Sequence, residues 1–278
     1  MPYTAEISRS NPTCFLFLID QSGSMADAPG DNSGRNKAEG VAKAVNSIIQ
    51  ELVYRCAKGE HILDRYYIGV IGYGDELSLG FTGDLAGEVL CPVSAVGNKP
   101  LRIENRKMLV DDGAGGVLEQ TVRFPVWFDP LADGGTPMCE AIRAAHSVLS
   151  EFIAEHPRCF PPIVINITDG EATDGDPEPP SEQLRALASE DGNVLMMNLH
   201  ISSQPGAPIL FPASDANLPD KYANLLFRMS SPLPPTMLRL ARSSYPWISD
   251  GARGFGFNAD MAGLAKFLDI GTRVSANR

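Results

Sequence analysis

Asp20, Ser22 and Ser24 form an Asp-x-Ser-x-Ser pattern that directly follows a run of apolar residues. A carboxylate and two hydroxyls at alternating positions provide oxygen ligands, which Mg²⁺, Mn²⁺ and Ca²⁺ prefer. The same residue types also close turns and cap helices, because their side chains accept hydrogen bonds from backbone N–H groups. On its own, this pattern favours a turn over a metal site.

Two later motifs supply further oxygen donors. Thr136 follows a Gly-Gly pair and precedes Pro137 at a predicted helix start, and Asp169 lies in a Thr-Asp-Gly sequence after an apolar run. Each motif alone is also explained as a helix start or a turn. Chance rarely supplies all three motifs in this order. The candidate metal ligands are therefore Asp20, Ser22, Ser24, Thr136 and Asp169.

This donor set contains two carboxylates and three hydroxyls, with no thiolate and no imidazole. Such hard oxygen ligands suit Mg²⁺, and also Mn²⁺ or Ca²⁺, rather than zinc. Because Mg²⁺ prefers about six oxygens and keeps several waters, the set leaves a position for an outside ligand. The sequence thus predicts an open site.

Strands and helices that must position these residues alternate along the chain. Spacing of apolar side chains by three and four residues predicts a helix over 36–56, and a further helix opens at 136–137 and runs to about 155. Short apolar runs predict strands over residues 13–19, 65–74, 161–170 and 193–202. This alternation indicates an α/β fold with a doubly wound, mostly parallel sheet. Ligands of such sheets bind beyond the carboxyl ends of the strands, which is where the candidate ligands fall.

Later segments continue the alternation with less regular spacing. A modest helix is expected near 181–190, and helical spacing recurs over 234–244 and 259–274. The stretch 251–259 supplies the turn before the last helix.

Residues 84–125 do not fit the alternation. The segment is rich in glycine, shows no amphipathic helix and is too long for an ordinary connection. We interpret it as an inserted β-hairpin or flap. The alternative is a solvated loop without a role, because long surface insertions cost little free energy.

Composition excludes several classes of function. The 278 residues are 44% apolar, enough for a large core, and carry a formal charge of −11, which opposes binding to nucleic acid. Five widely spaced cysteines without a Cys-x-x-Cys pair indicate neither a disulfide framework nor a zinc site. Without a signal pattern or an apolar run of about 18 residues, the expected location is the cytoplasm, away from membranes.

The stretches FLIDQSGSM, DGGTPMCEAI and INITDGEATDGD resemble the von Willebrand factor type A (vWA) domain and its metal-ion-dependent adhesion site (MIDAS). The resemblance implies a Rossmann-like sheet flanked by helices over about 13–272. It further implies a single domain over 1–278 that carries the insertion near 84–125 as its departure from the family.

The resemblance also assigns roles to the candidate ligands. It implies that the hydroxyls of Ser22, Ser24 and Thr136 touch the metal, and that the carboxylates of Asp20 and Asp169 act directly or through water. The layout is most similar to stand-alone bacterial vWA proteins of the tellurium-resistance type. This similarity implies an intracellular module of stress response or phosphosignalling, with a Ser/Thr kinase or a metal-dependent protein phosphatase as a possible partner.

Motifs of common enzyme classes are missing from the sequence. There is no phosphate loop, no nucleophile elbow and no His-Glu-x-x-His. The four histidines lack ligand spacing, although His200, late on a predicted strand, is the one best placed to approach the metal edge. Acidic residues between 171 and 178 could extend the site, but a solvated acidic loop is favoured.

We therefore predict a binding module and not an enzyme. A protein partner is expected to complete the coordination of the metal with a carboxylate, because neutral hydroxyls leave much of the ion's charge uncompensated. The alternative is a metal-dependent hydrolase in which the same ion activates water, although the sequence offers no obvious general base. A third interpretation is a structural metal that ties three loops together.

Overall fold

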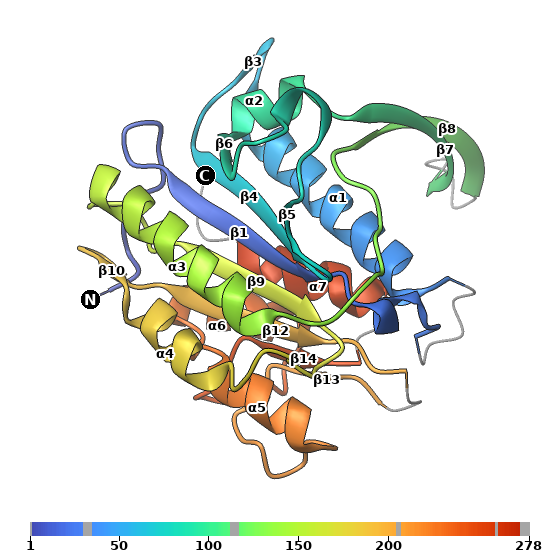
Figure 1. The fold of residues 1–278 in the computed structure, drawn as a ribbon. Coiled ribbons are helices and arrows are strands. Elements are labelled where there is room, and N and C mark those ends of the chain that lie inside the picture. The colour runs from blue at the N-terminus through green and yellow to red at the C-terminus, as the bar shows by residue number, and fades with distance from the viewer. Residues whose placement is uncertain (1, 30–34, 112–116, 204–206, 259–260, 273–278) are drawn as a thin grey trace.

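The computed structural model describes residues 2–29, 35–111, 117–203, 207–258 and 261–272. Its centre is an eight-stranded sheet with the strand order β13-β14-β12-β9-β1-β4-β5, in which β6 also pairs with β4 (Figure 1). The strands are β1 Thr13–Asp20, β4 Tyr66–Tyr73, β5 Leu77–Leu79, β6 Leu90–Pro92, β9 Ile163–Thr168, β12 Leu195–His200, β13 Ile209–Leu210 and β14 Phe255–Phe257.

The five inner strands of this sheet are parallel. The pairs β14–β12, β12–β9, β9–β1 and β1–β4 all run in the same direction, whereas β5, β6 and β13 are antiparallel to their neighbours. Asp20 lies opposite Tyr73, and His200 lies opposite Thr168, so the carboxyl ends of the strands share one edge. The predicted mostly parallel, doubly wound sheet is confirmed.

Strand β1 shows why its sequence is continuously apolar. Phe15 and Phe17 point into one hydrophobic core, and Leu16 and Leu18 point into the other. Successive side chains of a strand face opposite sides of a sheet, so a strand covered on both faces needs apolar residues at every position. The alternation therefore places β1 in the middle of three layers.

Helices cover both faces of the sheet (Figure 1). Apolar side chains of α1, α6 and α7 belong to one core, and those of α3, α4 and α5 belong to the other. The helices are α1 Lys37–Cys56, α2 Val93–Asn98, α3 Met138–Glu155, α4 Glu178–Ala186, α5 Lys221–Met229, α6 Pro235–Ser244 and α7 Met261–Thr272. Shorter elements are η1 Gly23–Ala26, η2 Gly83–Leu85, the pair β2 Ala57–Lys58 and β3 His61–Ile62, and the pair β10 Ala188–Ser189 and β11 Gly192–Asn193.

A chain of buried hydrogen bonds crosses the sheet near its carboxyl edge. The Tyr73 hydroxyl donates to Asn166 Oδ1 at 2.7 Å, and Asn166 Nδ2 donates to Asn198 Oδ1 at 3.0 Å. Asn198 Nδ2 in turn donates to Ser230 Oγ at 3.0 Å. Buried polar groups are costly unless they are paired, so this chain ties β4, β9 and β12 to the residue that follows α5.

The expected insertion contains the predicted hairpin. Strands β7 Arg102–Asp111 and β8 Val117–Val126 form a separate two-stranded antiparallel sheet. The preceding part of 84–125 is less separate, because β6 pairs with β4 and the six-residue α2 packs against α1. The helix α2 was not expected from the sequence, in which six residues are too few to show a helical period.

The base of the hairpin is anchored by Trp127 and Asn46. The buried Trp127 donates from Nε1 to the Val96 carbonyl at 2.7 Å and from its backbone N–H to Asn46 Oδ1 at 2.8 Å. Asn46 Nδ2, from the middle of α1, donates to the Phe128 carbonyl at 3.0 Å. Helix α1 therefore holds the chain where it leaves the hairpin.

Two further elements differ from the sequence-based expectations. The stretch 251–259 was interpreted as a turn, yet β14 lies within it and pairs with both β12 and β13. A three-residue strand such as β14 carries too short a pattern to be recognised without its partners. Helix α5 was also not predicted.

The structure also bears on the cysteines and on membrane insertion. All five cysteines are buried free thiols. Among the described residues, no helix is both long and apolar enough to cross a bilayer.

The anchoring of the hairpin generates a prediction about stability. Replacing residues 105–123 with an Asn-Gly turn, which joins the paired Glu104 and Phe124, should keep urea unfolding cooperative and change its free energy by less than about 1 kcal/mol. The reason is that no described side chain between 105 and 123 belongs to either core. Trp127→Ala should instead cost about 3–5 kcal/mol, because it opens a cavity at the base. Loss of a single cooperative transition in the shortened chain would contradict this view.

Candidate metal centre

The carboxyl edge of the sheet brings the five predicted ligands together. Asp20 ends β1, Ser22 and Ser24 follow it in the turn and in η1, Thr136 precedes α3, and Asp169 follows β9. A cleft of about 550 Å³ opens at this edge and is lined by all of these residues except Asp20. Their positions match the ligand-binding edge expected for a parallel sheet.

Asp20 is a carboxylate without exposed surface. Its Oδ1 accepts a hydrogen bond from the backbone N–H of Ser22 at 2.9 Å, and its Oδ2 accepts one from the hydroxyl of Thr168 at 2.7 Å. Burial raises the pKa of Asp20, and these hydrogen bonds offset part of that rise. A cation nearby would stabilise the ionised form further.

The hydroxyls of Ser22 and Ser24 lie side by side. Their oxygens are 3.0 Å apart, with Ser22 buried and Ser24 exposed. Only one hydrogen is shared in this contact, and each hydroxyl oxygen has two lone pairs, so both oxygens can still face a cation.

Backbone hydrogen bonds join the three loops of the site directly. The N–H of Gly23 donates to the carbonyl of Gly134 at 3.0 Å. Thr136 donates from its N–H to Thr173 Oγ1 at 2.9 Å, and the N–H of Thr173 donates back to the Thr136 carbonyl at 3.0 Å. These loops therefore hold one another without help from an ion.

Thr136 is not the residue that caps α3. The helix begins at Met138 with Pro137 at the N-cap, one residue later than predicted. Thr136 is 5% exposed, and its hydroxyl makes no hydrogen bond to the described part of the chain. This position leaves the hydroxyl available to a ligand in the cleft.

Asp174 performs the capping role at α3. Its Oδ1 accepts from the backbone N–H of Cys139 at 3.1 Å, and its Oδ2 accepts from that of Glu140 at 2.9 Å. Carboxylates stabilise helix N-termini by satisfying unpaired N–H groups and by complementing the helix dipole. The acidic loop after β9 thus braces the helix behind Thr136.

Other acidic side chains of this loop also have defined surroundings. Asp176 accepts a hydrogen bond from the N–H of Glu178 at 3.0 Å, and Glu178 forms a bidentate ion pair with Arg228 at 2.8 Å. Glu171 is the member of the group that lines the cleft and remains exposed. The loop is therefore more organised than a purely solvated acidic segment.

The cleft also contains a cation that the sequence analysis missed. Lys37 is only 4% exposed, and its Nζ lies 3.1 Å from Asp169 Oδ2 and 3.3 Å from the carbonyl oxygen of Ser24. An ammonium group is thus held by oxygens of two of the three loops that carry the predicted ligands. The arrangement shows that these oxygens favour a positive charge.

The position of Lys37 at the start of a helix is the sequence feature that could have drawn attention to it. Lys37 is the first residue of α1, where Asn36 and Glu39 form a capping box. A positive charge in the first turn is unfavourable with the helix dipole, so a buried lysine there needs a specific anionic partner. Asp169 is that partner.

His200 reaches the same cleft from the end of β12. Its Nε2 lies 2.7 Å from the Asp169 carbonyl oxygen and therefore donates to it, while Nδ1 has no partner among the described residues. Burial lowers the pKa of His200, so the ring is neutral near pH 7. At Gly170, which has a φ of 117°, an added Cβ would lie 2.8 Å from His200 Nε2. Glycine is needed there for both its backbone conformation and its size.

The residues present fit a hard divalent cation. The predicted donors are carboxylate and hydroxyl oxygens, the cleft is open, and the lysine ammonium already marks a cation-favouring position. No cluster of three or more His, Cys, Asp or Glu side chains suited to a metal occurs in the described ranges.

The capping role of Asp174 is testable through stability. Asp174→Ala should lower the free energy of urea unfolding by about 0.5–2 kcal/mol, because two N–H groups of α3 lose their acceptor. Asp84→Ala removes an exposed aspartate without a described hydrogen bond and should be nearly neutral. Equal stability of the two variants would show that the cap contributes nothing.

Comparisons with known proteins give structural likeness at low identity. No protein-family model matches the chain, and no curated protein matches it in sequence. The manganese-loaded TRAP protein of Plasmodium vivax aligns with a TM-score of 0.45 and 12% identity, over 93% of this chain and 72% of that one. The vWF domain of the pili tip protein Mfa5 from Porphyromonas gingivalis aligns with a TM-score of 0.33 and 14% identity, over 60% of this chain and 40% of that one.

The pilus adhesin RrgA of Streptococcus pneumoniae is also similar. It aligns with a TM-score of 0.31 and 14% identity, over 59% of this chain and 21% of the adhesin. At such scores and identities, the α/β architecture is established by the topology of this chain itself, from the parallel order of β14, β12, β9, β1 and β4.

Proposed function

We propose that the carboxyl edge of the sheet is a divalent-cation site of the vWA type that captures a carboxylate of a protein partner. The observation that carries the proposal is the meeting of four oxygen-bearing side chains from three separate loops at one open cleft, with the buried Asp20 at the end of the adjoining strand. Mg²⁺ is the expected ion, with Mn²⁺ or Ca²⁺ as alternatives. The residues that would hold it are Asp20, Ser22, Ser24, Thr136 and Asp169.

The chemistry of binding follows from the ligand types. The ion would supply a Lewis-acidic centre, and three neutral hydroxyls leave most of its charge uncompensated. Asp20 is buried under hydrogen bonds from Ser22 and Thr168, so it would contribute a fixed negative charge beneath the hydroxyls. An outside carboxylate would then be attracted to the open side of the cleft.

Lys37 would compete with the metal ion for the carboxylate of Asp169. The Lys37 ammonium contacts Asp169 Oδ2 and the Ser24 carbonyl oxygen. The Asp169 carboxylate would therefore have to leave Lys37 before it could bind a divalent ion. Like charges at short range repel strongly in a partly buried site. Lys37 would therefore lower the affinity for the ion while stabilising the loops in its absence.

Binding is favoured over hydrolysis by the surroundings of His200. A hydrolase that uses a metal-bound water also needs a general base within hydrogen-bond reach. His200 has Nε2 committed to the Asp169 carbonyl and Nδ1 buried, so it is not placed to accept a proton from the cleft. Glu171 is the exposed carboxylate on the rim, and phosphatase turnover that is lost in Glu171→Gln would support the hydrolase instead.

A purely structural metal is disfavoured by the loop contacts. The three loops are already joined by the hydrogen bonds of Gly23 with Gly134 and of Thr136 with Thr173. Removal of the ion should thus leave the melting temperature nearly unchanged. A large destabilisation by chelator would support the structural role.

The wider biological setting is an extension of the same proposal. The resemblance to tellurium-resistance-type proteins points to a cytoplasmic binding module in stress response or phosphosignalling. A Ser/Thr kinase or a metal-dependent protein phosphatase is the corresponding class of partner. Affinity capture with and without chelator tests this extension separately from metal binding itself.

Thr136 provides the sharpest test of the ligand set. Thr136→Val keeps the shape of the side chain and the backbone contacts to Thr173 but removes the hydroxyl, so Mn²⁺ affinity should fall by about tenfold or more. Thr136→Ser keeps the hydroxyl and should bind Mn²⁺ nearly as wild type does. Isothermal titration calorimetry measures both. Wild-type affinity in Thr136→Val would remove this hydroxyl from the site.

Lys37 provides a test with the opposite sign. Lys37→Met should raise Mn²⁺ affinity by about tenfold or more, because the competing charge is gone. The same change should destabilise the ion-free protein by about 3 kcal/mol, because Asp169 loses its buried partner. Added Mn²⁺ should restore part of that stability, whereas the exposed Lys58→Met should change neither quantity. Weaker Mn²⁺ binding by Lys37→Met would refute the competition.

A further inference from the structure

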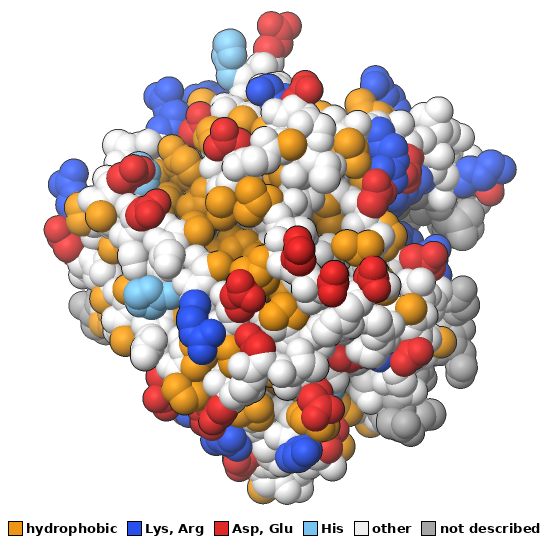
Figure 2. Space-filling model, in the orientation of Figure 1, with side chains coloured by type: hydrophobic (Ala, Val, Ile, Leu, Met, Phe, Trp, Pro, Cys, Tyr) orange, Lys and Arg blue, Asp and Glu red, His pale blue; other side chains and the backbone are white. Residues whose placement is uncertain are grey.

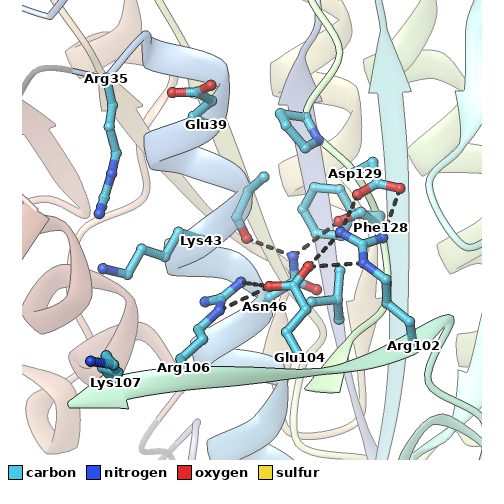
Figure 3. Close-up of a pocket in the computed structure, with 13 residues that line it drawn as sticks. Arg35, Glu39, Lys43, Asn46, Arg102, Glu104, Arg106, Lys107, Phe128 and Asp129 are labelled. Atoms are coloured by element: carbon cyan, nitrogen blue, oxygen red, sulfur yellow. Dashed lines mark hydrogen bonds and ion pairs between the residues drawn. The ribbon is translucent and has the colours of Figure 1, made fainter. Parts of the chain in front are cut away.

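A second cavity lies between helix α1 and the β7–β8 hairpin. Its volume is about 630 Å³, and it shares no lining residue with the metal cleft. Figure 3 shows side chains entering it from two sides, with Arg35, Glu39 and Lys43 at the helix and Arg102 and Arg106 on the hairpin. The cavity is therefore a separate feature of the molecule.

The lining of this cavity has a positive charge balance. It contains five basic side chains, from Arg35, Lys43, Arg102, Arg106 and Lys107. Its three acidic side chains come from Glu39, Glu104 and Asp129, which leaves an excess of two positive charges. The whole chain carries −11, so the basic residues are concentrated here against the general charge. Figure 2 shows Lys and Arg side chains gathered beside the hairpin at the upper right.

Acidic side chains of the lining pair with two basic side chains of the hairpin. Arg102 pairs with Glu104 and Asp129, and Arg106 donates twice to Glu104 while its guanidinium lies 3.6 Å from the centre of the Phe124 ring. These contacts hold both guanidinium groups in fixed positions. Fixed donors lose less entropy when they bind a ligand.

Arg35 and Lys43 have no such partners. Neither side chain forms an ion pair with the described residues. The nearby Glu39 caps the helix, where it accepts a hydrogen bond from the Asn36 backbone at 3.4 Å. On the hairpin, Lys107 pairs with Glu119, which lies outside the lining, at 2.7 Å. The basic side chains of the lining without an ion pair among the described residues thus lie on the helix side.

Both burial and neighbouring positive charges disfavour the charged form of Lys43. Partial burial, and then the positive charges of Arg35 and Arg106, lower the pKa of Lys43. Three cations from helix and hairpin are therefore close enough to repel one another. An anion between them would turn this repulsion into attraction.

We propose that this cavity binds a phosphate monoester dianion, held by Arg35 and Lys43 from the helix side and by Arg106 from the hairpin. The negative charge of such a ligand complements the positive balance of the lining, and the tetrahedral oxygens can accept hydrogen bonds from donors on both walls. Guanidinium groups bind phosphate through pairs of parallel hydrogen bonds, which a chloride ion cannot accept. Either a phosphorylated residue of another protein or a small phosphorylated metabolite presents this chemistry.

Binding is measured with the full chain in the presence of chelator, so that the metal centre plays no part. The probes are free O-phosphoserine, a peptide with one phosphoserine, and the same peptide with serine or aspartate at that position. Binding of free phosphoserine and of the phosphopeptide at similar affinity would indicate a metabolite, and a much tighter phosphopeptide would indicate a protein source. Binding of the serine or aspartate peptide as tightly as the phosphopeptide would overturn the proposal, and so would failure of both phosphate probes to bind.

Charge variants test where the phosphate binds. Arg35→Gln combined with Lys43→Gln should weaken binding by about tenfold or more, since two charge-assisted contacts are lost. Lys58→Gln combined with Lys99→Gln removes the same charge from exposed positions outside the cavity and should change affinity by less than about threefold. Glu39→Gln should strengthen binding, because it removes a negative charge from the lining. Equal losses in the two double variants would assign the effect to net charge and overturn the site.

Discussion

A single buried carboxylate constrains the functional edge of this protein. Asp20 has no exposed surface and ends β1, an interior strand of the sheet. An ionised group in that position is costly unless hydrogen bonds or charges compensate it. The N–H of Ser22 and the hydroxyl of Thr168 provide that compensation, and Thr168 also accepts from the N–H of Gly170 at 3.0 Å. The turn after β1 and the loop after β9 are therefore held by the same side chain.

The loops that carry the other candidate ligands depend on this arrangement. The Asp169 carbonyl accepts from His200, which lies opposite Thr168 in the neighbouring strand. The Asp174 carboxylate caps α3, and Thr173 in the same loop holds Thr136 through two hydrogen bonds. Since most of these contacts use backbone groups or side chains other than the candidate ligands, the hydroxyls remain free to turn toward an ion. The site is preorganised by its surroundings rather than by its own ligands.

Helix α1 separates the two charged centres of the molecule. Lys37, at its first position, enters the cleft at the carboxyl edge of the sheet, whereas Lys43 faces the hairpin. Six residues of α-helix correspond to about 9 Å of rise and a net rotation of about 120°, so the two ammonium groups point in different directions. The same helix also anchors the hairpin through Asn46. One rigid element thus presents a cation to an acidic cleft on one side and, on the other, a cation without an ion pair among the described residues to a basic cavity.

The sequence by itself determined four of the five parallel strands, the helices α1 and α3, and the edge where the candidate ligands meet. Those features follow from local patterns: the continuous apolar run of β1, the helical spacing of α1, and motifs that directly follow a strand. Only the tertiary structure decided which groups surround the ligands. Lys37 and Asp169 are 132 positions apart, and Asp174 caps a helix that starts 36 residues before it. Strand β14 and the cavity beside the hairpin likewise exist only through pairing and packing between distant segments, because a three-residue strand or a lone lysine carries no local pattern that identifies its partner.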